Sequence, residues 1–277
     1  MDFLNNQLLK EIIRIALIED LGNGDITTLL TIPDSSHSQA KIIAKESFVL
    51  AGMPFVHEVF SALGIVEIKD FVAEGAAVKN GDVIAELSGK TATLLAGERV
   101  ALNMLQRVSG ISTKTREFVS KVEGLNVSIT DTRKTAPGLR LLDKYGVNVG
   151  GGKNHRFGLY DGVLIKDNHI AASGGVKKAV ELARKVHHLL KIEVEVSNFD
   201  DLYEALAAGA DVIMLDNMTI DDMKKAVGIT AKRALLEASG NVSLENVRAI
   251  AETGVDIISI GALTHSVKAA DISMKIV

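Results

Sequence analysis

The second half of the chain alternates short apolar runs with longer amphipathic stretches. Six β-branched runs each end in a polar or small residue, and apolar positions recur at helical spacing between most of them. This order predicts parallel strands joined by crossover helices, because each connection must return to the same end of the sheet. The runs are "VSITD" at 127–131, "VLIK" at 163–166, "IEVEVS" at 192–197, "DVIMLD" at 211–216, "ALLEAS" at 234–239 and "DIISIG" at 256–261.

The number and spacing of these runs define the expected architecture. Glu195, Asp216, Ser239 and Gly261 follow one another at nearly constant intervals of 21 to 23 positions. Six runs fall short of the eight strands of a complete (β/α)8 barrel. We therefore expect a six-stranded, open or incomplete α/β barrel.

The first 110 residues have a different, mixed pattern, in which helical periodicity alternates with short strand-like runs. We expect an α+β domain here, to which the last residues, "DISMKIV", add a strand. Helices are predicted over Leu4 to Leu21, 54–64 ("PFVHEVFSALG") and 96–112 ("AGERVALNMLQRVSGIS"), and strands within 40–52 and 71–90.

Composition narrows the function classes. The net charge of −4 argues against binding to bulk nucleic acid, and the absence of Cys excludes disulfides, thiolate nucleophiles and Cys-ligated metals. No apolar run approaches the length of a membrane span, and the N-terminal segment lacks the apolar core of a signal peptide. We expect no membrane partner and a cytoplasmic location.

The ends of the predicted strands carry most of the candidate chemistry, because α/β barrels bind ligands at the C-terminal ends of their strands. If the barrel prediction holds, these residues share one rim. They are Asp131 with Arg133 and Lys134, Lys166, Glu195, Asp216, Ser239 with Gly240, and Ser259 with Gly261.

One part of this rim is cationic and glycine-rich. Between residues 131 and 169 seven Lys/Arg face four Asp, around the three glycines at 150–152. Arginine binds carboxylate or phosphate with two parallel hydrogen bonds, and glycines let backbone N–H groups approach an anion. The segment therefore indicates an anionic ligand with more than one charged group, although Lys144 and Lys153 fit a solvated surface equally well.

The other part of the rim combines acids with small residues. Glu195 and Asp216 precede loops that contain Ser and Gly, the usual phosphate-binding position in barrels. Two carboxylates near a phosphate suggest Mg2+ held largely through substrate oxygens and water. The alternation in "IEVEVS" turns Glu193 and Glu195 to the same side. His37, His57 and His265 lack partners at ligand spacing, which argues against a His-based zinc site.

The segment "DTRKTAPGLRLLDKYGVNVGGGKNHRFGLYDGVLIKDNHI" closely resembles the signature region of the quinolinate phosphoribosyltransferase family. Other blocks of that family are matched in order by "IEDLGNGDITT", "GERVALNMLQRVSGIST", "EVEVSNFDDL", "IMLDNM", "LEASGNVSLENV" and "DIISIGALTHS". The resemblance implies a type II phosphoribosyltransferase fold. Its N-terminal α/β sandwich domain would cover residues 1–110, completed by 265–277, and its incomplete, six-stranded α/β barrel residues 111–264.

The same resemblance implies a reaction. Phosphoribose passes from phosphoribosyl pyrophosphate (PRPP) to the ring nitrogen of quinolinate, and decarboxylation gives nicotinate mononucleotide, CO2 and pyrophosphate, with Mg2+ required, in de novo NAD synthesis. Two alternatives remain open from the residues. One is a sister phosphoribosyltransferase of the type associated with molybdenum transport, and the other is a non-catalytic barrel that binds a sugar phosphate.

The resemblance also implies roles for individual residues. Lys134, Lys166, Glu195 and Asp216 are the expected catalytic residues, and the last two face the ribose hydroxyls and Mg2+. Arg99 is expected to reach the site of a neighbouring subunit, which implies a homodimer as the minimum functional unit and leaves a higher oligomer open. The quinolinate site would comprise Arg99, Thr132, Arg133, Lys134, His155, Arg156 and Lys166. The PRPP site would comprise Lys134, Lys166, Glu195, Asp216, Ser239, Gly240, Asn241, Ser259 and Gly261.

Overall fold

The computed structural model of the protein describes residues 7–277 and divides them into two compact units. Unit 1 comprises the described residues up to Arg116, together with 135–151 and 263–277, and unit 2 comprises 117–134 and 152–262. Residues 135–151 thus cluster with unit 1, although the sequence places them inside the barrel segment. The physical reason is close packing of Gly146 in α5 (Arg140–Val149), where a Cβ would lie 3.0 Å from the Ile111 side chain.

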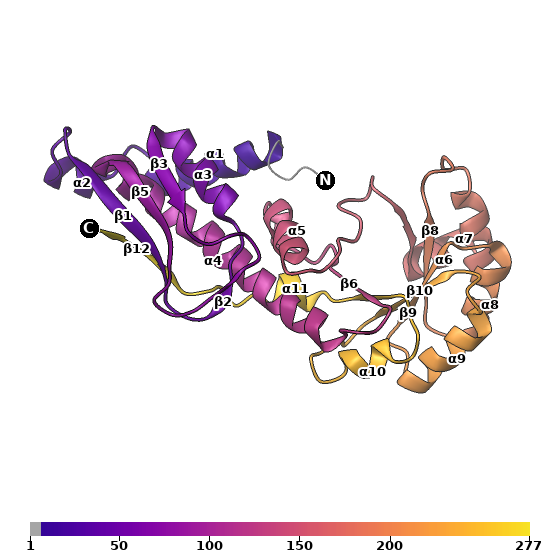
Figure 1. The fold of residues 1–277 in the computed structure, drawn as a ribbon. Helices are drawn as coiled ribbons and strands as arrows, with labels where there is room; N and C mark the ends of the chain where they lie inside the picture. Colours follow the sequence, from indigo (N-terminus) through magenta and orange to yellow (C-terminus); the bar gives the residue numbers. More distant parts are fainter. Residues whose placement is uncertain (1–6) are drawn as a thin grey trace. The chain divides into compact units, whose positions relative to one another are not determined.

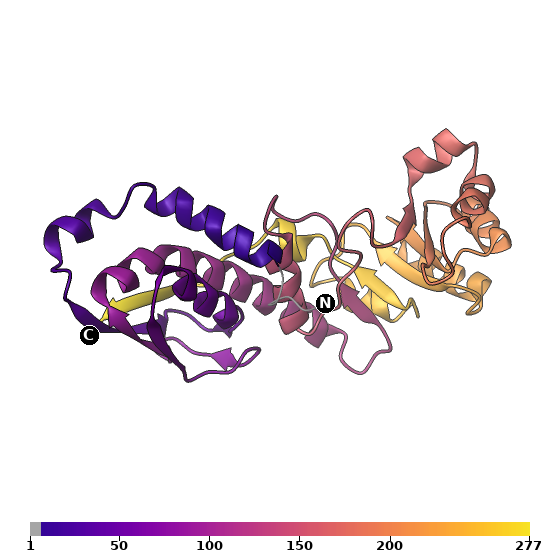
Figure 2. The ribbon, with the colours of Figure 1, turned by 90° about the horizontal axis from the view of Figure 1, so that it is seen from above.

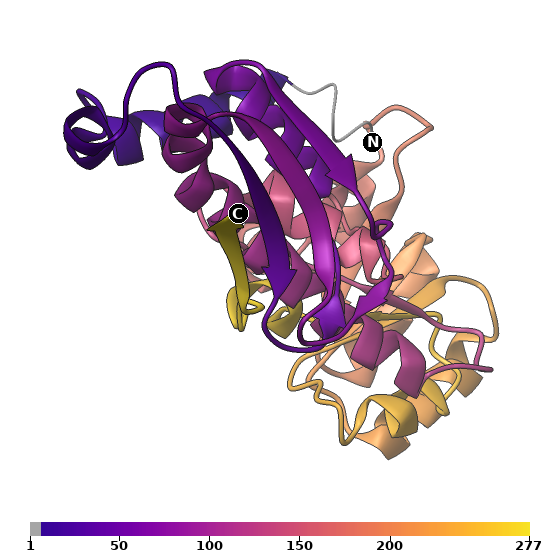
Figure 3. The same ribbon diagram turned by 60° about the vertical axis from the view of Figure 1, so that its left-hand side comes forward.

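Unit 1 is built on an antiparallel four-stranded sheet with the order β12–β1–β5–β3 (Figure 3). Its last strand comes from the C-terminus of the chain, because Ile276 of β12 pairs with Ala40 of β1. The C-terminal segment therefore completes the sheet of this unit. The strands are β1 (His37–Ala44), β3 (Val66–Asp70), β5 (Val83–Lys90) and β12 (Ile272–Ile276).

The longest helix, α4 (Thr91–Lys121), extends well beyond the predicted span of 96–112. Glycines let its neighbours approach closely. A Cβ on Gly97 would lie 2.5 Å from the ring of Phe60, and one on Gly110 would lie 2.1 Å from the carbonyl oxygen of Lys268. The two glycines are needed because bulkier residues here would push apart the elements that build the core of unit 1.

The N-terminal helix is found as expected over its described part. α1 (Gln7–Leu21) matches the predicted helix, whose first residues, 4–6, lie outside the described residues. The remaining elements of this part are α2 (Ile26–Thr31), β2 (Phe48–Val49), α3 (Met53–Leu63), β4 (Ala77–Val78) and α11 (Ala262–His265), where the chain returns to unit 1.

Unit 2 is a six-stranded, entirely parallel sheet with the order β6–β11–β10–β9–β8–β7. All six predicted strands are present, which confirms the α/β fold with an incomplete barrel. The strands are β6 (Ser128–Thr130), β7 (Val163–Ile165), β8 (Ile192–Val196), β9 (Val212–Asp216), β10 (Leu235–Ser239) and β11 (Ile257–Ser259).

Helices that follow the strands cover the outer side of this sheet (Figures 1 and 2). Except for the short helix at 167–173, which has no buried residue, each of them buries apolar side chains, as covering a parallel sheet requires. Among the described residues, no helix is both long enough and apolar enough to cross a membrane. The helices of unit 2 are α6 (Asp167–Ser173), α7 (Val176–Ala183), α8 (Phe199–Ala208), α9 (Ile220–Thr230) and α10 (Val247–Ala251).

The inner side of the barrel is unusually polar. Thr130, Glu193, Glu237 and Ser259 come from four different strands, and each is less than 9% exposed. Each also has one side-chain oxygen without a hydrogen-bond partner within the described part of the chain. Since buried polar atoms are costly unless they are satisfied, this interior is suited to water, protons or a polar ligand rather than to tight apolar packing.

Candidate active site

The cationic segment begins on a short extended stretch that runs beside β6. Lys153 forms an isolated parallel bridge with Thr130, with its own N–H donating to the carbonyl oxygen of Ile129 at 2.8 Å. Asp131, fully buried, accepts hydrogen bonds from the Asn154 side chain at 2.7 Å and from the His155 main-chain N–H at 2.9 Å. One buried carboxylate therefore fixes the backbone from which His155 and Arg156 project.

Arg156 lies close to a second arginine. Partial burial, followed by the positive charge of Arg133, lowers the pKa of the Arg156 guanidinium, and the carboxylate of Glu193 partly offsets this. The guanidinium donates to the carbonyl oxygen of Gly162 at 2.9 Å, and within residues 7–277 it forms no ion pair with a carboxylate. Two positive charges near enough to repel each other favour the binding of an anion.

Lys166 and Glu195 meet at the ends of adjacent strands. Lys166 follows β7, and its ammonium group forms an ion pair with Glu195 of β8. The main-chain N–H of Lys166 donates to the His169 ring at 2.9 Å, which fixes the start of α6. Lys166 therefore places a positive charge next to a carboxylate on the acidic side of the rim.

The loops after β9 and β10 form a tight pocket of backbone. Gly240 and Asn241 both have positive φ, at 96° and 51°, and Asn217 has a φ of 54°. A Cβ on Gly240 would lie 2.1 Å from the Asn217 side-chain oxygen, so only glycine fits there. Consecutive residues in unusual conformations turn their N–H groups to one side, a common device for binding phosphate.

Two carboxylates, Glu195 and Asp216, lie at the C-terminal ends of the neighbouring strands β8 and β9. Asp216 accepts a hydrogen bond from the Asn217 side chain at 3.0 Å, and Glu195 is held by Lys166. These two oxygen ligands fit Mg2+ that arrives with a pyrophosphate, since this ion usually combines one or two carboxylates with phosphate oxygens and water. They do not by themselves form a complete protein cage.

Beneath the rim, His155, Glu193 and Glu237 form a compact cluster. Their nearest nitrogen and oxygen atoms all lie within 4.8 Å of one another. The His155 Nε2 atom is 3.0 Å from Glu193 and 3.8 Å from Glu237. Burial, and then the charge of Glu193, raise the pKa of Glu237 to about 7. Because Arg156 and Lys166 already supply positive charge nearby, the cluster is better suited to hold a proton than a metal ion.

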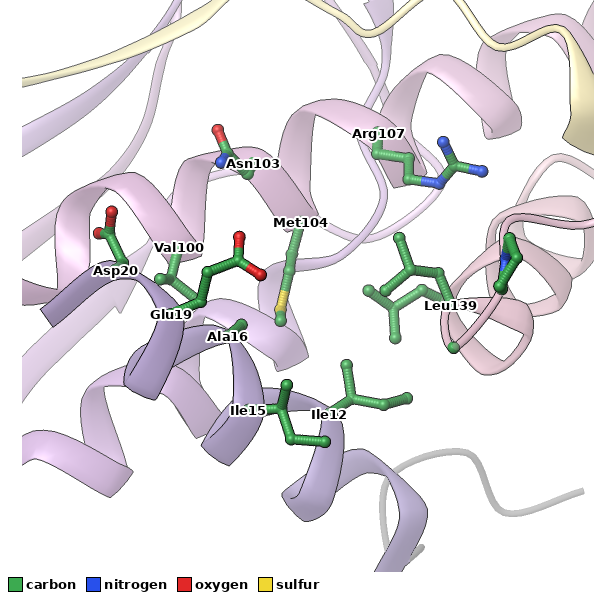
Figure 4. A pocket seen from close by; sticks show the side chains of 13 residues that line it. Ile12, Ile15, Ala16, Glu19, Asp20, Val100, Asn103, Met104, Arg107 and Leu139 are labelled. Atoms are coloured by element: carbon green, nitrogen blue, oxygen red, sulfur yellow. The ribbon is translucent and has the colours of Figure 1, made fainter. Parts of the chain in front are cut away.

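A separate cavity in unit 1 has the wrong chemistry for an anionic ligand (Figure 4). Its volume is about 440 Å3, and its walls are largely apolar. Glu19 and Asp20 lie on its edge, and its one arginine, Arg107, is bound to the buried carboxylate of Asp143 at 2.8 Å. The cavity therefore repels a dianion, whereas the rim of unit 2 attracts one.

The structure brings together most of the site residues that the sequence predicts. Thr132, Arg133, Lys134, His155, Arg156, Lys166, Glu195, Asp216, Ser239, Gly240, Asn241, Ser259 and Gly261 all lie in unit 2, at or next to the C-terminal ends of its strands. Arg99 is different, because it is an exposed residue of α4 in unit 1. Lys144, which fits a solvated surface by its sequence, is only 1% exposed.

The sequence pattern does not single out Glu237 as a site residue. It lies in the middle of β10, where a charged residue between apolar neighbours resembles an ordinary solvent-facing position. The pattern places Glu193 on the same side as Glu195, but without a partner. Glu193 and Glu237 could have been identified by their position, since each is a carboxylate on the inward face of a barrel strand, below a rim that is already charged.

An incomplete α/β barrel with cationic side chains and a glycine-containing loop at one rim is suited to an enzyme that handles phosphorylated substrates. Residues 25–109 and 111–275 match the family descriptions "Quinolinate phosphoribosyl transferase, N-terminal domain" and "C-terminal domain". The chain therefore belongs to the quinolinate phosphoribosyltransferase family.

Individual relatives agree with this assignment. The chain is 47% identical to "Probable nicotinate-nucleotide pyrophosphorylase [carboxylating]" of Bacillus subtilis, over 99% of this chain and 95% of the relative. It is 43% identical to "Quinolinate phosphoribosyltransferase [decarboxylating] 2b, mitochondrial" of Nicotiana tabacum, over 97% and 82%. The solved nicotinate-nucleotide pyrophosphorylase of Francisella tularensis is 40% identical, with a TM-score of 0.94 and complete coverage of both chains.

Proposed function

We propose that this protein transfers phosphoribose from PRPP to the nitrogen of quinolinate and that the product loses one carboxylate, giving nicotinate mononucleotide, CO2 and pyrophosphate. The observation that carries the proposal is that Arg133 and Arg156 lie on one rim, near enough for the charge of Arg133 to lower the pKa of Arg156. Quinolinate has two adjacent carboxylates, and two guanidinium groups match them in charge and in hydrogen-bond geometry.

The transfer step breaks the bond between ribose C1 and the pyrophosphate oxygen, and the quinolinate nitrogen forms the new bond to C1. Positive charge develops on the ribose as the pyrophosphate leaves. Glu195 and Asp216 stabilise that positive charge, and Lys134 and Lys166 stabilise the negative charge of the leaving group. The loop of Ser239, Gly240 and Asn241, with Ser259 and Gly261, binds the 5-phosphate.

Mg2+ is the cofactor that we propose for this site, held by Glu195 and Asp216 together with PRPP oxygens and water. If bound there, Mg2+ would neutralise part of the pyrophosphate charge. The residues of the rim orient the two substrates. Their arrangement supports this assignment through the placement of two carboxylates on adjacent strand ends.

Decarboxylation leaves an electron pair on the ring carbon beside the nitrogen, which has become positively charged on forming its bond to ribose. That positive nitrogen and the surrounding cations stabilise the electron pair until a proton from solvent or a side chain replaces the lost carboxylate. Thr132, Lys134 and Lys166 complete the proposed contacts to quinolinate.

We further propose a homodimer in which Arg99 of one copy completes the quinolinate site of the other. Exposure of Arg99 on α4 is compatible with that role. Mixing an Arg99→Ala chain with an Arg133→Ala chain should restore part of the activity, because one of the two sites would then contain both wild-type residues. Failure to restore any activity would contradict the shared site. A cytoplasmic location stays a prediction.

A product assay by mass spectrometry tests the main proposal. The protein is incubated with PRPP and Mg2+, first with quinolinate and then with nicotinate as the acceptor. We expect nicotinate mononucleotide and CO2 from quinolinate only. Product from nicotinate would contradict the assigned acceptor, and the absence of turnover with both would favour a barrel that only binds a sugar phosphate.

A further inference from the structure

The ring of His155 is held from both of its nitrogen atoms by the protein itself. Nδ1 accepts a hydrogen bond from the main-chain N–H of Arg156 at 2.8 Å, and Nε2 lies 3.0 Å from a carboxylate oxygen of Glu193. A nitrogen that accepts a hydrogen bond carries no proton, so the ring proton must be on Nε2. The tautomer of His155 is thereby determined by its neighbours.

Two buried carboxyl groups stand opposite that proton. Glu193 on β8 is 7% exposed and Glu237 on β10 is 1% exposed, and Nε2 lies 3.8 Å from the second. Each carboxyl group also has one oxygen without a hydrogen-bond partner within the described residues. The nearer of the two, Glu193, accepts the His155 Nε2–H.

The hydrogen bond to Nδ1 links this cluster to the proposed substrate site. It holds the Arg156 N–H, while Asp131 holds the His155 N–H at 2.9 Å. Together they fix the backbone at the point where the Arg156 side chain leaves it. The Arg156 guanidinium then reaches Gly162 at 2.9 Å, beside Arg133.

We infer that Glu193 and Glu237 are positioning residues that act through His155 on Arg156. They hold the imidazole with its proton on Nε2, so that Nδ1 receives the Arg156 N–H and the guanidinium is placed for a substrate carboxylate. This inference rests on the proposed function.

Replacing Glu193 by Gln should move the ring proton of His155 from Nε2 to Nδ1. The amide N–H2 of glutamine can donate to Nε2, which favours a proton on Nδ1, where it would face the Arg156 N–H. Two donors that face each other repel, so the backbone and the guanidinium should move. We expect the Kd of quinolinate to rise at least tenfold, whereas the Kd of PRPP should change less than twofold because the loops after β9 and β10 are untouched.

The test combines two measurements on the full chain. The 15N resonances of the His155 ring, identified by their loss in His155→Asn, report the tautomer, and calorimetry reports the affinities for quinolinate and PRPP. We expect the Nε2-protonated neutral ring in the wild type and the Nδ1-protonated ring in Glu193→Gln. Glu252→Gln, an exposed residue paired with Arg248, is the matched control and should behave as the wild type.

Three results would overturn the inference. They are a wild-type His155 ring protonated on Nδ1 or on both nitrogens, an unchanged quinolinate affinity in Glu193→Gln, and equal losses of quinolinate and PRPP affinity in a variant with a wild-type urea midpoint. If Glu193→Gln does not fold, the tautomer of His155 in the wild type still decides whether the inference holds. Failure of the wild type to bind quinolinate would contradict the proposed function but would leave the tautomer measurement valid.

Discussion

Two arginines, one in each unit, show how the same side chain serves folding in one place and binding in another. Arg107 of unit 1 makes two hydrogen bonds, of 2.8 and 2.9 Å, to the fully buried carboxylate of Asp143. Arg156 of unit 2 lies beside Arg133 and donates to a carbonyl oxygen instead. The first charge is neutralised by an ion pair within the fold, whereas the second has no such ion pair among the described residues and favours an anion from outside.

The largest effect should follow from removing the second arginine. We expect Arg156→Ala to lower kcat/KM for quinolinate by about 10³-fold, which corresponds to roughly 4 kcal/mol of lost charge-assisted binding in the transition state. Steady-state kinetics with each substrate varied would measure this. The KM of PRPP should change less than threefold. An equal rise in the KM of both substrates would contradict the assignment of Arg156 to quinolinate binding.

Removing the first arginine should instead affect the fold. We expect Arg107→Ala to lower the free energy of unfolding by about 3 kcal/mol, because it leaves the Asp143 carboxylate buried without its partner. Urea denaturation would measure the loss, and Arg107→Ala with Asp143→Leu should recover part of it. A variant of normal stability that binds quinolinate poorly would show that Arg107 belongs to the site.

A change in the loop proposed to bind phosphate tests whether the arginine pair acts separately from that loop. A Cβ at Gly240 would lie 2.1 Å from the Asn217 oxygen, at a φ of 96°. We expect Gly240→Ala to weaken PRPP binding by about 30-fold, or roughly 2 kcal/mol. Calorimetry should show quinolinate affinity within twofold of the wild type. A comparable loss of quinolinate affinity would mean that the two halves of the rim are one unit.

The smallest effect on stability should come from Glu237, the buried acid below the rim. Burial and the nearby Glu193 raise the pKa of Glu237 to about 7 in the folded protein, above its ordinary value of 4.5. The folded state then binds more protons than the unfolded state between these values, so its contribution to stability falls as pH rises from about 4.5 to 7.

Glutamine at position 237 keeps the shape of the side chain without this titration. We expect Glu237→Gln to be more stable than the wild type by about 1–2 kcal/mol at pH 8, with the gain disappearing below about pH 5. Urea midpoints from pH 4.5 to 8.5 would measure it. A gain that does not vary with pH would contradict the ionisation of Glu237 in this range.

Much of unit 2 could be predicted from the sequence because its strands are marked by local apolar runs. The polar end of each run is enough to place Glu195, Asp216 and Ser239 on one rim. The approach of Glu193 to Glu237 could not be predicted in this way, because they lie on strands separated by β9 and meet only through the curvature of the sheet.

The environment of single side chains could not be predicted from the sequence either. Nothing in "NHR" indicates that Arg156 donates its main-chain N–H to the ring of His155. Nor does it indicate that Asp131 accepts hydrogen bonds from Asn154 and His155. Lys144 likewise has the local sequence of an exposed residue, although the packing of α5 in unit 1 buries it. Such features depend on contacts between distant segments, which local periodicity does not record.

The affinity of the free protein for acceptors that differ by one carboxylate tests the central claim most directly. If Arg133 and Arg156 form a binding site for two adjacent carboxylates, calorimetry without PRPP should show quinolinate binding at least about 100-fold more tightly than nicotinate, or roughly 3 kcal/mol. This preference should shrink to less than about tenfold in Arg156→Ala. Equal affinities of the wild type for the two acids would contradict the account.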